Sequence, residues 1–162
     1  MAQDGARPEA IQRYYADEFA WCYGCGRQNA AGHHFETFWH GDRTLTEYMP
    51  RPEHTAIPGF VYGGLLASLV DCHSTGSAAL ALYRQEGHEP GDGAPVPRCV
   101  TASLKVDYRK PTPLGVLLRV HGRIEEVGAR KVVVASEVRA EDVTVATSLV
   151  VAVRAPEAMT RR

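Results

Sequence analysis

The stretch PGFVYGGLLASLVDCHSTG, residues 58–76, places a pair of glycines and one carboxylate on an otherwise apolar segment. Gly63 and Gly64 would begin a helix, where free backbone N–H groups can stabilise a developing oxyanion. Without side chains, the glycines also let a carbonyl group approach the backbone closely. Asp71 has apolar neighbours, and an unpaired buried carboxylate is costly. We therefore interpret Asp71 as a general base or nucleophile, with a structural cap or pair as the alternative.

The spacing between the glycines and Asp71 predicts how such a site is assembled. Asp71 lies seven or eight residues beyond the glycines, which is about 10–12 Å along a helix axis. One chain cannot bring both to the same reacting group across that distance. A two-fold partner could place its own Asp71 opposite the first chain's glycines. The spacing therefore predicts a homodimer, with a dimer of dimers as a further option.

Two of the four cysteines, Cys22 and Cys25, have the spacing of a zinc-ligand pair, but no second cysteine pair follows. His33 and His34 could complete a ligand set, yet adjacent histidines rarely both fit one ion. A thioredoxin-like motif would need a preceding strand, which is absent from the pattern. We therefore predict a turn that holds two small, partly buried thiols, and a site that requires no metal.

The elements that must position these residues follow from the apolar pattern. Residues 63–84 are rich in Leu and Ala and contain no Pro, which predicts one long helix, apolar almost all round and wrapped by the fold. Gly76 weakens this helix, while the small residues around it would let a sheet approach closely. Strands are expected at 33–40 and 43–50 before the helix, and at 98–108, 116–127, 131–140 and 143–153 after it.

This β-β-α-β-β-β-β order predicts an α+β protein with one antiparallel sheet curled around a central helix. Such a sheet has a bare edge or face, so association through the sheet is expected. We divide the chain into an N-terminal arm (1–21) with one or two helical turns, a domain (22–155) and a C-terminal tail (156–162).

Composition excludes several classes of function. The formal net charge is −1, so no global basic field favours nucleic acid or an anionic membrane. No run is expected to reach the roughly 20 apolar residues of a membrane span, so no membrane insertion is expected. The first fifteen residues lack the apolar core of a signal peptide, which predicts a cytoplasmic protein.

Four segments together resemble one family. They occur in the order found in hotdog-fold acyl-CoA thioesterases of the phenylacetyl-CoA thioesterase branch. Along the chain these segments are CYGCGRQNAAGHHF, HTAIPGFVYGGLLASLVDCHSTG, VTASLKVDYRKPTPLG and EEVGARKVVVASEV. The resemblance covers roughly residues 22 to 153. It implies a hotdog fold, a dimer-interface active site and hydrolysis of an acyl-CoA thioester to free acid and coenzyme A. Coenzyme A enters as part of the substrate, and no other cofactor is implied.

The resemblance also implies roles for single residues. Thr101 occupies the position of a Thr or Ser that holds the nucleophilic water or substrate, a plain strand residue being the alternative. His54 would order the loop before the glycines or line the pocket, unless it is simply a surface histidine. His73 lies about 200° around the helix from Asp71 and should point elsewhere. Two cation pairs are candidates for the coenzyme A phosphates, or solvated turns: Arg109 with Lys110, and Arg130 with Lys131.

The chain departs from the family pattern at two positions. Tyr62 replaces the His of His-Gly-Gly, where a Tyr hydroxyl can still donate a hydrogen bond, so we keep it as a substrate-binding candidate. Ala56 stands where many members carry an Asn. Two other functions remain open from the sequence: a hotdog hydratase or dehydratase that uses His54 or His73, and a non-catalytic module that binds acyl-CoA.

Overall fold

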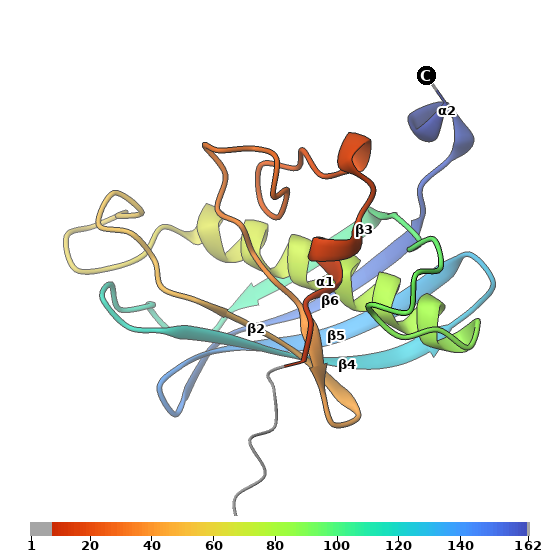
Figure 1. Ribbon diagram of the computed structural model, residues 1–162. Helices are drawn as coiled ribbons and strands as arrows, with labels where there is room; N and C mark the ends of the chain where they lie inside the picture. Colours follow the sequence, from red (N-terminus) through yellow and green to blue (C-terminus); the bar gives the residue numbers. More distant parts are fainter. Residues whose placement is uncertain (1–7, 162) are drawn as a thin grey trace, which may run out of the picture.

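The computed structural model describes residues 8–161 as a six-stranded antiparallel sheet curled around one long helix (Figure 1). The elements are β1 (Phe38–His40), β2 (Arg43–Tyr48), α1 (Gly63–Gln85), β3 (Cys99–Tyr108), β4 (Leu118–Val127), β5 (Lys131–Ala140) and β6 (Val143–Arg154). The strands lie in the order β1-β2-β4-β5-β6-β3. The predicted α+β hotdog fold is confirmed, and the helix and the last four strands begin and end within about two residues of their expected positions.

The first strand is shorter than predicted. Residues 33–40 were expected to form it, but β1 covers only Phe38–His40. Residues 33–35 pair instead with the turn that holds Cys22 and Cys25. The N–H of His33 bonds to the carbonyl of Tyr23, and the N–H of Phe35 bonds to the carbonyl of Gly24. These bonds attach the turn to the fold.

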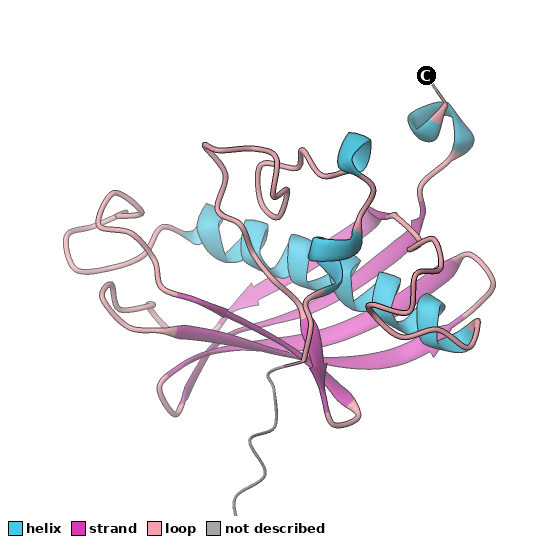
Figure 2. Cartoon of the chain, viewed as in Figure 1, coloured by secondary structure: helices cyan, strands magenta, loops and turns pink. Residues whose placement is uncertain are grey.

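Helix α1 lies across the concave face of the sheet (Figure 2). Leu65, Leu66, Leu69 and Val70 pack with apolar side chains of β4, β5 and β6 into one part of the core. By length and composition α1 could cross a membrane, contrary to the sequence estimate, but 83% of its most apolar stretch is buried inside the fold. The sheet therefore accounts for its apolar character.

The N-terminal segment packs onto the core and does not lie free as a polar arm. Its predicted helical turns are two 3-10 helices, η1 (Ile11–Tyr14) and η2 (Asp17–Phe19). Ile11 and Tyr15 are buried against the C-terminal half of α1. Residues 1–7 of the predicted arm and the last residue of the tail lie outside the described residues. The tail contains one short helix, α2 (Glu157–Thr160).

Strand β3 forms one edge of the sheet, and within residues 8–161 its ladder pairs only with β6. Leu104 is opposite Val150 in that ladder, so both side chains point to the same face. Val150 is fully buried, whereas Leu104 is 41% exposed. The inner, apolar face of the sheet is therefore only partly covered at Leu104, in the middle of β3.

Candidate active site

Asp71 and Thr101 are brought together, although thirty residues separate them. The Thr101 hydroxyl, near the start of β3, donates a hydrogen bond to Oδ1 of Asp71 on α1. Asp71 is half-buried, and its second carboxylate oxygen has no donor among the described residues. One oxygen is thus anchored and the other is left for a proton or a substrate.

A cavity of about 220 Å³ opens beside this pair. Its lining comes from the N-terminal turn, the middle of α1 and the start of β3: Cys22, Asp71, Cys72, Thr75, Arg98, Cys99, Val100 and Thr101. The Thr75 hydroxyl bonds to the backbone carbonyl of Asp71, one turn earlier in the helix. The Asp71 carboxylate therefore lies in the middle of helix α1 and faces the cavity.

The start of α1 shows why glycines stand there. A Cβ atom on Gly63 would lie 3.3 Å from ring atoms of Tyr108, and one on Gly64 would lie 2.6 Å from Cε2 of Tyr62. Two aromatic rings thus lie against the helix start, and Tyr62 as N-cap residue makes no side-chain capping bond. The first N–H groups of the helix remain suited to a carbonyl or oxyanion.

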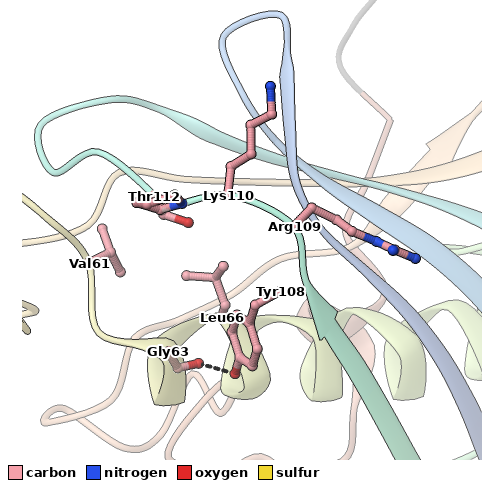
Figure 3. Close-up of a pocket in the computed structure, with 8 residues that line it drawn as sticks. Val61, Gly63, Leu66, Tyr108, Arg109, Lys110 and Thr112 are labelled. Carbon is pink, nitrogen blue, oxygen red and sulfur yellow. Dashed lines mark hydrogen bonds between the residues drawn. The ribbon is translucent and has the colours of Figure 1, made fainter.

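Tyr108 is a residue that the sequence analysis assigned no role. Its hydroxyl donates a 2.6 Å hydrogen bond to the carbonyl oxygen of Gly63 (Figure 3). This bond connects the end of β3 to the start of α1. The available signal was its place in VTASLKVDYRKPTPLG, one of the segments that resemble the family.

A second cavity, of about 320 Å³, adjoins Gly63. Its lining is Val61, Gly63, Leu66, Tyr108, Arg109, Lys110, Pro111 and Thr112. The cation pair Arg109 and Lys110 thus lies beside the helix start, with both charged groups directed away from Gly63 (Figure 3). The Arg109 guanidinium donates to the Thr147 hydroxyl at 3.2 Å.

The other cation pair lies at the opposite end of the sheet. Lys131 is opposite Val153, which is opposite Val100 at the start of β3. Lys131 also forms a 3.3 Å ion pair with Glu126. Arg130 and Lys131 therefore lie toward the Thr101 end, and one chain does not bring the two cation pairs together.

His54 is not a surface histidine, so that alternative is wrong. It is 5% exposed, its Nδ1 accepts the N–H of Arg51 at 3.0 Å, and its carbonyl accepts the N–H of Tyr62 at 3.0 Å. Burial, with a contribution from the Arg51 charge, lowers the pKa of His54. These contacts hold the loop that leads into the glycines.

His73 points away from Asp71, as predicted. It is fully buried, and its Nδ1 lies 2.9 Å from the Thr46 hydroxyl while its Nε2 lies 3.3 Å from that of Thr44. Burial, with a smaller contribution from His121, lowers the pKa of His73 to about 3. His73 is a neutral core residue and does not line either cavity.

The sequence-family model of the thioesterase superfamily matches residues 58–147, which include both glycines, Asp71 and Thr101. The chain belongs to the thioesterase superfamily. This membership and the hotdog fold were both predicted from the sequence motifs, and both are confirmed.

Similarity to individual proteins agrees with this family. A thioesterase superfamily protein from Shewanella loihica PV-4 is 46% identical, with a TM-score of 0.64 over 80% of this chain and 99% of that one. The PaaI protein of the E. coli phenylacetic acid degradation operon has the same fold, at 15% identity and a TM-score of 0.60 over 76% of this chain and 81% of that one.

Among curated proteins, acyl-coenzyme A thioesterase THEM4 of Xenopus laevis is 30% identical over 100 residues. These residues make up 62% of this chain and 39% of the Xenopus protein. The chain thus matches well under half the length of this relative.

Proposed function

We propose that the protein hydrolyses an acyl-CoA thioester to free acid and coenzyme A. The pairing of the Asp71 carboxylate with the Thr101 hydroxyl, at the wall of a cavity, carries the proposal. It lies inside the segment that matches the thioesterase superfamily. The Xenopus relative is an acyl-coenzyme A thioesterase by name, which supports acyl-CoA as the substrate class.

We further propose that two copies form the site, because each chain separates its two parts. Asp71 and Thr101 lie near the start of β3, whereas Gly63 and Tyr108 lie near its end. If β3 pairs antiparallel with β3 of a second copy, the start of each strand lies opposite the end of the other. The partly covered inner face at Leu104 would then be buried.

In this arrangement the thioester carbonyl accepts hydrogen bonds from the N–H groups at Gly63 and Gly64 of one copy. Asp71 of the other copy removes a proton from water, and the hydroxide attacks the carbonyl carbon. The tetrahedral intermediate collapses, the C–S bond breaks, and the coenzyme A thiolate takes the proton from Asp71. The products are a carboxylic acid and a free thiol.

The second route open to Asp71 is direct attack, which forms a mixed anhydride that water then opens. A single turnover in ¹⁸O-labelled water distinguishes water attack from a direct attack whose anhydride opens at the Asp71 carbonyl. A water attack places the label only in the released acid. Direct attack followed by hydrolysis at the Asp71 carbonyl places one label in the carboxylate of Asp71.

Arg109 and Lys110 are proposed to meet the coenzyme A phosphates, because they lie beside the cavity at Gly63. Arg130 and Lys131 lie at the Thr101 end, so in a two-copy site they approach the same substrate from the other chain. Guanidinium and ammonium groups both suit phosphate oxygens.

The test is thiol release from short-chain, long-chain and aromatic acyl-CoAs, with Asp71→Asn as the variant and Asp142→Asn as the control. Asp142 lies exposed in the turn between β5 and β6. We expect Asp71→Asn to lose roughly 10²- to 10⁴-fold in rate and Asp142→Asn to keep wild-type activity. Thiol release that is unaffected by Asp71→Asn would refute the assignment. Binding of acyl-CoA without turnover would instead support a non-catalytic module.

A further inference from the structure

Three cysteines that are distant in sequence meet beside the Asp71 cavity. The Sγ atoms of Cys22, Cys25 and Cys72 all lie within 4.8 Å of one another, and those of Cys22 and Cys72 are 3.8 Å apart. Zinc binds thiolates at about 2.3 Å in tetrahedral geometry, which places neighbouring sulfur atoms roughly 3.8 Å apart. The cluster therefore already has dimensions close to three corners of a zinc site.

We propose that Cys22, Cys25 and Cys72 bind one thiophilic divalent metal ion, zinc being the ion of first choice, with water from the neighbouring cavity as the fourth ligand. The sequence disfavoured zinc because no second cysteine pair follows Cys25. The third ligand instead comes from the middle of α1, where Cys72 looks like an ordinary apolar helix residue. Cys22 and Cys72 both line the cavity that holds Asp71, which provides a route for the water.

The turn between Cys22 and Cys25 is built to present sulfur. The N–H of Gly26 bonds to the carbonyl of Cys22 at 2.7 Å, and the N–H groups of Gly24 and Cys25 point to the Cys22 sulfur. Backbone donors of this kind stabilise a thiolate ligand. A Cβ on Gly24 would lie 2.2 Å from the Cys72 sulfur, so only glycine lets the turn approach α1 this closely.

The charge of the site is also balanced. Three thiolates and a divalent cation carry a net charge of −1. The half-buried guanidinium of Arg98 interacts electrostatically with all three cysteines. It is held in place by bonds to the carbonyls of Phe19 and Cys99. A buried charge needs a partner of opposite sign, and Arg98 supplies one to the loaded site.

This inference does not depend on the proposed hydrolysis, because metal content is measured without any substrate. The full chain would be purified under reducing conditions from zinc-supplemented medium, and zinc would be measured by mass spectrometry. We expect about one zinc per chain. Cobalt loading should give the near-ultraviolet charge-transfer band of thiolate-bound cobalt.

Cys22→Ser and Cys72→Ser should each lose the zinc and the cobalt band. Cys99→Ser is the matched control, because Cys99 is buried and lines the same cavity but is outside the sulfur cluster. If Cys72→Ser does not fold, Cys22→Ser and the wild-type cobalt spectrum still decide the question. Wild type without stoichiometric metal, a Cys22–Cys72 disulfide in place of metal, or equal metal loss in Cys99→Ser would overturn the proposal.

Discussion

Acidification should destabilise the protein through His73. The imidazole is fully buried and hydrogen-bonded to threonine hydroxyls, and burial lowers its pKa from the ordinary 6.5 to about 3. Because the folded pKa is lowered, the unfolded chain takes up the proton first as the pH falls. The stabilisation is therefore complete above the unfolded pKa and is lost between about pH 6.5 and pH 3. One pKa unit corresponds to about 1.4 kcal/mol, so the whole effect is about 5 kcal/mol.

The assay is urea unfolding of wild type and His73→Gln at pH 7 and pH 5. Gln keeps a hydrogen-bond donor and acceptor but does not titrate, so all other titrating groups contribute equally to both proteins. Moving from pH 7 to pH 5 should cost the wild type about 2 kcal/mol more of unfolding free energy than the variant. Equal losses in the two proteins would refute the assignment of His73 as a buried neutral group.

Three further substitutions test the site. Thr101→Val removes a hydrogen bond to the Asp71 carboxylate worth about 1.5–3 kcal/mol, so kcat/KM should fall roughly 10- to 100-fold. Thr101→Ser keeps the hydroxyl and should keep most activity. Equal losses in the two variants would contradict a role for the hydroxyl. Tyr108→Phe removes the bond to the Gly63 carbonyl, worth about 1 kcal/mol, and should lower kcat/KM several-fold; an unchanged value would show that this bond does not position the helix start. Lys110→Ala should raise KM for acyl-CoA at low salt and weaken its salt dependence, and an unchanged salt profile would exclude a phosphate contact.

The element order could be predicted from the sequence because each element has a strong local pattern. The long run of Leu and Ala in α1 and the shorter Val-rich strands differ in composition and length, and Gly and Pro separate them. The predicted start of the first strand was wrong because residues 33–35 bond to the turn near Gly24. Neither of these two segments has a periodic pattern that would predict the pairing. The burial of the N-terminal segment was missed for the same reason, since it depends on single contacts of Ile11 and Tyr15.

The family resemblance assigned both Asp71 and Thr101 to the site, but it gave Thr101 the role of holding water or substrate. Their direct hydrogen bond could not be predicted, because no local rule connects a helix with a strand thirty residues away. The direction of His73 followed from helix geometry alone. Its hydroxyl partners Thr44 and Thr46 could not, since they depend on how β2 lies against α1. The third sulfur of the cysteine cluster was hidden likewise, because Cys72 joins the other two only after the turn packs on α1.

A mixing experiment tests most directly whether two copies share one active site. Asp71→Asn removes the carboxylate, and Gly63→Val fills the cavity at the helix start, where even a Cβ lies 3.3 Å from the Tyr108 ring. Each variant alone should be nearly inactive. A mixed dimer contains one site with an intact Asp71 from one chain and an intact Gly63 from the other.

Co-expression of the two variants should therefore restore thiol release. Random pairing gives half mixed dimers with one intact site of two, so the expected rate is about a quarter of wild type. In a second preparation, the two purified variants are denatured, mixed and refolded together. This preparation should give the same fraction of wild-type activity. Mixed dimers that form but show no more activity than either variant alone would contradict a shared site.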